Sequence, residues 1–143
     1  MSLESGMPIT YTDSLDGLTA DHLRGGFYKG WPNPPTPETH LRVLQGSAHV
    51  VVAKDGANVV GYITAITDGV LAAYIPHLEV LDSYQGQGIG SELVRLMLEK
   101  LRAIYMIDLI CDVEVQPFYE RLGMIRYTGM IKRNYDRQSG TPE

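Results

Sequence analysis

The amino-acid sequence predicts a mixed α/β domain built around one β-sheet. Runs of β-branched and apolar residues at 48–54, 58–67 and 71–81 are separated by tight turn signals. A long amphipathic helical pattern follows at 90–104, and a compact apolar run at 106–111 comes directly after it. We therefore expect a single mixed sheet of six or seven strands, with an antiparallel N-terminal meander and one parallel crossover, flanked by about four helices.

The N-terminal part predicts a short strand and two helices. Residues 8–11 favour a strand, and leucines at helix-like intervals predict a helix at 18–25. The second helix has clear boundaries. Thr36 is a preferred N-cap, Pro37 suits the first helical position, and Gly46 lies just past the expected end.

The meander is defined by its turns. Asp55-Gly56 joins the first two runs as a hairpin, and Asp68-Gly69 turns the chain into the third run. Pro76 lies inside that third run and has no backbone N–H, so it fits a sheet edge or a bulge better than a fully paired centre.

Two helices and an extended segment complete the chain. The helix at 90–104 has a broad apolar face, which predicts that it lies flat on the sheet. A short helix is expected at 115–122, stopped by Gly123. Residues 124–132 return to an extended pattern, and such an exposed terminal strand offers an edge for a homodimer. We expect residues 134–143 to form a flexible tail.

Length and composition indicate one domain over residues 1–143, large enough to bury about two thirds of its unfolded surface. The net charge of −5 argues against a nucleic-acid surface. The single cysteine, Cys111, excludes an intrachain disulfide, and no Cys/His cluster has metal-ligand spacing. Without an apolar run of membrane-spanning length or a signal peptide, we expect a cytoplasmic protein with no membrane partner. Residues 1–6 precede a second methionine, Met7, and we interpret them as an expression-vector remnant.

The stretch Tyr84–Ser91 joins the third strand run to the long helix and contains three glycines at alternate positions, Gly86, Gly88 and Gly90. Without Cβ atoms at those positions the backbone can curl, so that its N–H groups point at one ligand. The helix start adds unpaired amides and a positive dipole end. The stretch therefore predicts a site for phosphate or another compact anion.

Three glycine-loop chemistries compete for this stretch. A P-loop needs Gly-Lys-Ser/Thr, which is absent from the sequence. A dinucleotide fold needs G-x-G-x-x-G and several βαβ units, and neither condition is met here.

The third chemistry rests on a resemblance. Residues 76–94, PHLEVLDSYQGQGIGSELV, resemble the acetyl-CoA signature of the GNAT superfamily of N-acetyltransferases, including its Q-x-x-G-x-G/A core. Residues 118–124, FYERLGM, resemble the second motif of that superfamily. The expected order of helices and strands also matches, so the resemblance implies a GNAT-like fold.

The resemblance implies that acetyl-CoA is the acetyl donor, with no metal required. In the superfamily, amides of the glycine loop hold the pyrophosphate, and the strand that precedes it pairs with the pantetheine arm. The Val80 amide would then polarise the thioester carbonyl. By this resemblance the donor-binding residues are Leu78, Val80, Gln85, Gly86, Gln87, Gly88, Ile89, Gly90 and Ser91.

The resemblance also implies catalytic roles. Tyr119 falls where the superfamily often carries the tyrosine that protonates the leaving thiolate. Glu79 and His77 alternate on one face of the same strand, so either, or a water molecule, is a candidate base for the attacking amine. Asp112 stands where many members have an asparagine that contacts the cofactor. A carboxylate accepts from a pantetheine amide but cannot donate to it.

The acceptor is expected opposite the donor, near residues 27–31, which begin the proline-rich loop at 27–37. Its aromatic residues, Phe27, Tyr28 and Trp31, either form a wall or cage for an ammonium group or cover the hydrophobic core. The sequence thus predicts an N-acetyltransferase acting on a small-molecule or protein amine. The alternatives are a non-catalytic acyl-CoA-binding sensor or interaction module, and a nucleotide-binding protein.

Overall fold

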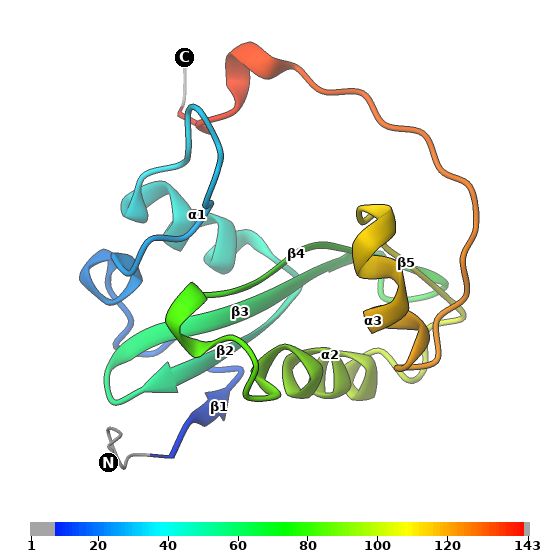
Figure 1. The fold of residues 1–143 in the computed structure, drawn as a ribbon, viewed down its shortest axis with the longest axis horizontal. Helices are drawn as coiled ribbons and strands as arrows, with labels where there is room; N and C mark the ends of the chain where they lie inside the picture. The colour runs from blue at the N-terminus through cyan, green and yellow to red at the C-terminus, as the bar shows by residue number, and fades with distance from the viewer. Residues whose placement is uncertain (1–7, 142–143) are drawn as a thin grey trace.

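The structure is a computed structural model that describes residues 8–141. Five strands form one sheet in the order β1-β2-β3-β4-β5 (Figure 1). Neighbouring strands are antiparallel except β4 and β5, which are parallel. This confirms the predicted antiparallel meander and parallel crossover. The strands are β1 (Thr10–Thr12), β2 (His49–Asp55), β3 (Asn58–Thr67), β4 (Ala72–Val80) and β5 (Met106–Asp108).

The prediction of six or seven strands is wrong for the described residues. Residues 124–132 are extended but form no ladder with any strand described here. They belong to an exposed stretch that Figure 1 shows arching away from the sheet, and we call residues 124–133 the C-terminal segment. A strand pattern forms a strand only beside a partner, and β5 offers an edge of just three residues.

The prediction of about four helices is also corrected. The described chain has three α-helices and four short 3₁₀ turns. The helix predicted at 18–25 is one of the 3₁₀ turns, and the helix predicted at 115–122 is a shorter α-helix preceded by a 3₁₀ turn. The α-helices are α1 (Pro37–Gly46), α2 (Ile89–Lys100) and α3 (Gln116–Glu120), and the 3₁₀ turns are η1 (Ala20–Leu23), η2 (Asp82–Tyr84), η3 (Val113–Val115) and η4 (Tyr135–Arg137).

The tail predicted to be flexible contains the turn η4. It is held near the proline-rich loop, because the N–H of Asn33 donates to Oε1 of Gln138 at 2.8 Å. The predicted vector remnant at 1–6 lies outside the described residues. Between residues 8 and 141, no helix is long and apolar enough to cross a membrane.

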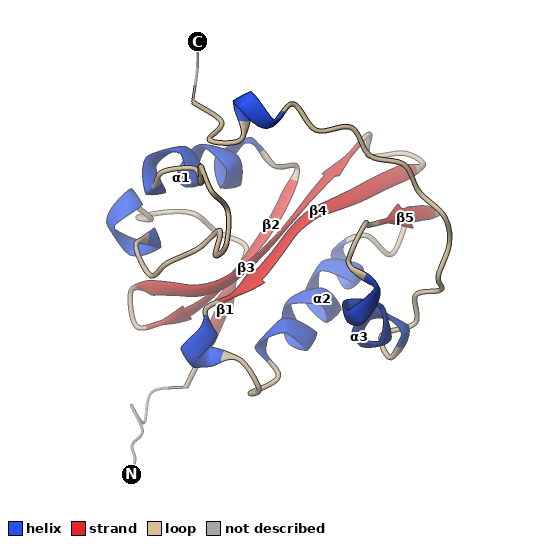
Figure 2. Cartoon of the chain, turned by 45° about the horizontal axis from the view of Figure 1, so that its top comes forward, coloured by secondary structure: helices blue, strands red, loops and turns tan. Residues whose placement is uncertain are grey.

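Helices cover both faces of the sheet. Helix α1 and turn η1 lie on one face, and α2 and α3 lie on the other (Figure 2). Strand alternation separates two cores, since Val51 and Ala53 face α2 whereas Val50 and Val52 face α1. Four α2 side chains are buried in the first core: Ile89, Leu93, Val94 and Met97.

Strand β4 is irregular near its middle. Its register with β3 shifts between Thr64 and Ile66, opposite Ile75 and Pro76. Pro76 therefore lies at a bulge, as its missing N–H predicts. Beyond this bulge, β4 keeps its pairing with β3 but loses its pairing with β5.

The N-cap of α1 gives a simple test of the local structure. The Thr36 hydroxyl oxygen accepts from the N–H of Thr39 at 3.1 Å, as the sequence predicts. We expect Thr36→Ala to lower the free energy of unfolding by about 1 kcal/mol in urea titrations, since one helix N–H loses its partner. Thr36→Ser keeps an oxygen acceptor and should retain most of that stability. Equal losses in both variants would contradict the capping role.

Candidate active site

Strand β4 has different neighbours along its two edges. It pairs with β3 up to Val80, but with β5 only from Ala72 to Tyr74. We call residues 77–80 the open half of β4, because among the described strands none pairs with their second edge.

Backbone groups in the open half alternate between β3 and the unpaired edge. The N–H of Leu81 donates to the carbonyl of Val60 at 2.9 Å, and the register with β3 is continuous from Val80 back to His77. Because hydrogen-bonded pairs alternate along an antiparallel ladder, the backbone groups of Leu78 and Val80 point away from β3. They present donors and acceptors to an extended ligand lying in the place of a strand.

The glycine-rich stretch follows the open half and forms the start of α2. Gly86 and Gly88 have positive φ angles of 80° and 83°, which side-chain-bearing residues rarely adopt. Gly88 is the N-cap of α2 and makes no side-chain capping bond, so the first-turn amides lack partners within the helix. No atom lies within 4 Å of a Cβ built at either glycine, which leaves the space above the loop open. This geometry suits a phosphate group.

Gln85 ties the loop to the strand. Its backbone N–H donates to the carbonyl of Asp82 at 3.2 Å, and its Nε2 donates to the carbonyl of Val80 at 3.0 Å. The second bond agrees with the outward direction of the Val80 carbonyl. The backbone N–H of Gln85 thus already has an acceptor. The N–H groups that remain for an anion are those of residues 86–91. Within this stretch, Gln87 is exposed and the Ile89 side chain packs into the core.

A cavity of about 210 Å³ lies on the α1 face of the open half. The strand contributes His77, Leu78 and Glu79, and the proline-rich loop contributes aromatic side chains. This brings together five predicted residues, His77, Leu78, Glu79, Tyr28 and Trp31. The complete lining is Tyr28, Lys29, Trp31, Tyr62, Pro76, His77, Leu78 and Glu79.

Glu79 holds the loop against the strand. Its carboxylate accepts from the N–H of Tyr28 at 2.8 Å and from the N–H of Lys29 at 3.3 Å. Tyr28 is the one described non-glycine residue with a positive φ, 63°. Non-glycine residues seldom adopt this conformation, and these two bonds help to keep it. A carboxylate has further lone pairs, so Glu79 still has capacity to accept from a ligand.

Histidines and tyrosines are packed together beside this cavity. His40 is 1% exposed, and its ring lies 5.0 Å from that of Tyr28 and 4.5 Å from that of Tyr62, centre to centre. The His77 ring lies 6.2 Å from the Tyr28 ring, and His77 is paired with Thr64 across the strands. Nε2 of His40 and Oγ1 of Thr64 are buried without a hydrogen-bond partner in the described chain.

Burial determines the charge state of this cluster. It lowers the pKa of His40 to about 4, with a further lowering from His77, and it also lowers the pKa of His77. Burial raises the pKa of Tyr28 and of Tyr62. These four groups are therefore neutral near pH 7, and the negative charge beside them comes from Glu79.

Tyr119 lies in a different cavity from Glu79 and His77. Its side chain, 9% exposed, lines a groove of about 790 Å³ together with Cys111 and the C-terminal segment. Burial, and secondarily Cys111, raises the pKa of Tyr119 to about 12. Tyr119 is thus a weaker acid than a free phenol. A rise of one in its pKa makes proton transfer to the thiolate less favourable by about 1.4 kcal/mol.

Like Val80 and the glycine loop, the predicted residues Phe27 and Asp112 lie outside both cavities. The Phe27 ring packs edge-on against His40 and Tyr62, with centres 5.2 and 5.3 Å apart, so it belongs to the core beneath the smaller cavity. Asp112 is exposed at the start of η3, where its carbonyl accepts from the N–H of Val115 at 2.9 Å.

Sequence reasoning missed four residues of this region: Lys29, His40, Tyr62 and Thr64. Tyr62 and Thr64 occur in an ordinary strand pattern, and His40 lies in an ordinary amphipathic helix. No local spacing marks them, because their contacts join segments that are distant in the sequence. Residues 8–141 contain no group of three or more His, Cys, Asp or Glu side chains that could hold a metal ion.

Comparison with known proteins identifies the family. The model of the Acetyltransferase (GNAT) family matches residues 18–124. The chain belongs to this family.

Solved structures agree over most of the chain. It is 47% identical to a protein from Deinococcus radiodurans R1 described as an acetyltransferase, with a TM-score of 0.93 and 100% of both chains covered. A GNAT family acetyltransferase from Streptococcus pneumoniae TIGR4 is 31% identical, with a TM-score of 0.73, covering 89% of this chain and 98% of that one.

Curated relatives are more distant. The chain is 28% identical over 108 residues to an uncharacterized N-acetyltransferase of Pyropia yezoensis, covering 72% of this chain and 62% of the relative. It is 31% identical over 67 residues to N-alpha-acetyltransferase 30 of Schizosaccharomyces pombe, covering 43% and 45%. The chain thus spans less than two thirds of the length of either relative.

Proposed function

We propose that the protein transfers an acetyl group from acetyl-CoA directly to a primary amine. The observation that carries this proposal is the open half of β4, whose backbone groups at Leu78 and Val80 face an unpaired edge beside the glycine-capped start of α2. The family membership supports the transferase activity, and the strand and loop together suit a donor with an extended amide arm and phosphates.

On the donor side, the N–H groups of residues 86–91 would hold the phosphates. Leu78 and Val80 would pair with the extended arm, and the Val80 N–H would hydrogen-bond the carbonyl of the acetyl thioester. Asp112, exposed near the end of β5, would accept from a donor amide. When bound, acetyl-CoA supplies the activated acetyl group, and the chain contributes binding and orientation.

On the acceptor side, we assign the amine to the smaller cavity. Trp31 and Tyr28 offer aromatic faces, and Glu79 supplies a carboxylate among neutral histidines and tyrosines. A cationic amine is attracted both to the carboxylate and to the aromatic faces. A cavity of about 210 Å³ accommodates the amine-bearing end of a molecule. The N-acetyltransferase names of both curated relatives support a nitrogen acceptor.

For the proton of the attacking amine, we propose different roles for Glu79 and His77. Both oxygens of Glu79 accept backbone N–H groups of the acceptor loop, so Glu79 positions that loop and attracts the ammonium group. His77 lines the same cavity and is neutral near pH 7, because burial lowers its pKa. A neutral imidazole accepts a proton directly or through water.

These roles predict different kinetic defects. Because burial lowers the pKa of His77, its imidazole is neutral and able to act as a base at pH 7, and kcat/KM should fall as the pH drops through that pKa. His77→Gln should lower kcat about 100-fold and remove this acidic limb. Glu79→Gln should mainly raise KM, because the loop loses an acceptor for the N–H of Tyr28 or Lys29.

The matched control is His49→Gln, which alters a histidine at the start of β2 and outside the lining of the cavity. It should keep both the rate and the pH profile. A His77→Gln variant with the wild-type acidic limb would exclude His77 as the base. If Glu79→Gln were to lower kcat alone, that would transfer the role to Glu79.

A thiol-release assay on a panel of amines tests the proposed function. Polyamines, aminoglycosides, amino acids and peptides with free N-termini should be included, with acetyl-CoA binding measured by calorimetry in parallel. We expect binding and acceptor-dependent thiol release. Binding without release on every acceptor would instead favour the acyl-CoA-binding module, and tighter binding of NAD than of acetyl-CoA would favour a nucleotide-binding protein.

The cytoplasmic location of the protein stays a prediction.

A further inference from the structure

The smaller cavity has an uncompensated negative charge. Among the described residues that line it, Glu79 and Lys29 are the charged ones. The ammonium group of Lys29 already has a partner, because it forms an ion pair with Asp82, which lies outside the lining. One positive and two negative groups therefore leave the charge of Glu79 without a cation to balance it.

The contacts of Glu79 do not cancel this charge. Its carboxylate accepts from the backbone N–H groups of Tyr28 and Lys29, which are neutral donors. Burial raises the pKa of Tyr28 and of Tyr62, and the charge of Glu79 contributes to both increases. Tyr28 belongs to the proline-rich loop and Tyr62 to β3, so the negative potential reaches two other segments around the cavity.

Other basic groups near the proline-rich loop are paired or neutral. Arg24, just before the loop, lies 2.8 Å from Asp21 and 2.8 Å from Glu38. His40 and His77 are neutral near pH 7, because burial lowers their pKa. A carboxylate entering the cavity would thus meet a like charge, and within its described lining no cation is left to pair with it.

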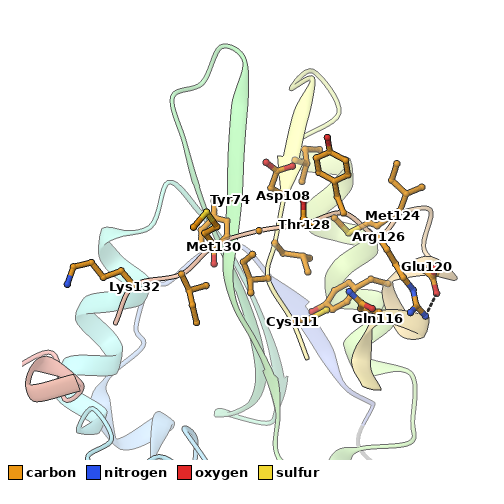
Figure 3. Close-up of a pocket in the computed structure, with 18 of the residues that line it drawn as sticks. Tyr74, Asp108, Cys111, Gln116, Glu120, Met124, Arg126, Thr128, Met130 and Lys132 are labelled. Atoms are coloured by element: carbon orange, nitrogen blue, oxygen red, sulfur yellow. Dashed lines mark hydrogen bonds and ion pairs between the residues drawn. The ribbon is translucent and has the colours of Figure 1, made fainter. Parts of the chain in front are cut away.

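The larger groove has a different balance of charge. Figure 3 shows Arg126 beside Glu120 and Lys132 at the other end of the groove. The charged lining of this groove consists of Asp108, Glu120, Arg126, Lys132 and Arg133. Cations are thus in excess there, although the chain as a whole has a net charge of −5. The negative character of the smaller cavity is therefore a local property.

Size and shape also restrict the ligand of the smaller cavity. Its volume is about 210 Å³, whereas pockets for drug-sized ligands have about 300–1,000 Å³. The rings of Tyr28 and Trp31 lie 4.9 Å apart, centre to centre, at an interplanar angle of 62°. An ammonium group drawn to Glu79 would leave a short apolar stem against these rings.

We propose that the acceptor is a small primary amine with no carboxylate beside its amino group. An α-amino acid has both groups on one carbon, so an amine placed near Glu79 would bring a second carboxylate close to the first. Like charges in such a partly buried site repel each other. An amine without the carboxylate, or with a neutral amide in its place, avoids this repulsion. The inference rests on the proposed function, since it takes the smaller cavity as the acceptor site.

Trp31 provides a reporter for the test, because it is the single tryptophan of the chain and lines the cavity. Its emission should change as an amine binds, so dissociation constants can be measured without turnover. The probes are two matched sets: isopentylamine, leucine and leucinamide, and phenethylamine, phenylalanine and phenylalaninamide. We expect each amine to bind about 10- to 100-fold more tightly than its amino acid. Each amide should resemble the amine more than the amino acid.

Two variants should reduce this discrimination by different routes. Glu79→Gln removes the repelling charge, and Asp82→Asn leaves Lys29 free to pair with a carboxylate. Both should bring the ratio of the two dissociation constants towards one, and comparing ratios between variants cancels the different basicity of the probes. The matched control is Glu99→Gln, which removes an exposed carboxylate from α2, outside the cavity. It should keep the wild-type ratio.

Several outcomes would overturn the proposal. One is equal binding of an amine and its amino acid, and another is an amide that binds as weakly as the amino acid, since size and not charge would then explain the difference. A wild-type ratio in both Glu79→Gln and Asp82→Asn, or unchanged Trp31 emission with every probe, would also contradict it. Thiol release separates this inference from the proposed function. Equal release from amines and amino acids contradicts the inference alone, whereas no release from any acceptor contradicts the transferase activity.

Discussion

Gly88→Val is expected to lower the affinity for acetyl-CoA by on the order of 100-fold, and to leave the chain folded. Gly88 has a φ of 83° and is the N-cap of α2, so valine there must shift the backbone that directs the loop amides. Loss of even one hydrogen bond to a charged group weakens binding by about 1.5–3 kcal/mol. The dissociation constant from titration calorimetry measures the effect.

Gly69→Val is a matched control for this variant. Gly69 also has a positive φ, 77°, with no atom within 4 Å of an added Cβ, but it lies in the turn between β3 and β4. Both variants store a similar backbone strain, about 1–3 kcal/mol, and should show similar drops in melting temperature. Equal losses of affinity would show that strain alone is responsible. Wild-type affinity in Gly88→Val would exclude the loop as the phosphate site.

Tyr119→Phe is expected to lower kcat about 100-fold with little change in KM, as for loss of a general acid. The ring keeps its packing in the core cluster beside α2, so the variant removes the hydroxyl and little else. Steady-state kinetics with a confirmed acceptor separate the two constants. A variant with full turnover at all pH values would show that Tyr119 is not the acid.

The pH profile sharpens this test. Burial raises the pKa of Tyr119 to about 12, so the hydroxyl stays protonated over the usual assay range. Its deprotonation should therefore produce no alkaline limb below about pH 12, and Tyr119→Phe should lower the rate evenly across that range. Tyr105→Phe is the control, since Tyr105 is 83% exposed and lines neither cavity. It should keep wild-type rates.

Local patterns predicted those parts of the fold whose structure depends on near neighbours. The hairpin at Asp55-Gly56, the cap at Thr36 and the bulge at Pro76 all follow from residues within a few positions of one another. The C-terminal segment shows the limit of such patterns. Its alternation is that of a strand, but no strand forms without a neighbouring edge, and the sequence of the segment does not specify that edge.

The candidate site divides in the same way. The open half of β4 and the glycine-capped start of α2, which we propose for the donor, were predictable because they are contiguous in the sequence. The acceptor side was predicted as an aromatic loop with His77 and Glu79 as candidate bases, without its buried neighbours. Its contacts with His40 and Tyr62 arise when α1 and β3 pack together. The spacing of residues along the sequence does not specify that packing.

The bulge at Pro76 has a consequence for solubility. An unpaired strand edge is a template on which other chains can add strands and aggregate. In β4, the unpaired edge lies beside Pro76, which has no backbone N–H to donate, and the register shift bends the strand there. The strand ends four residues later, at Val80. A short, bent edge is a poor template for an extended foreign strand. The edge can thus stay unpaired at little risk of aggregation.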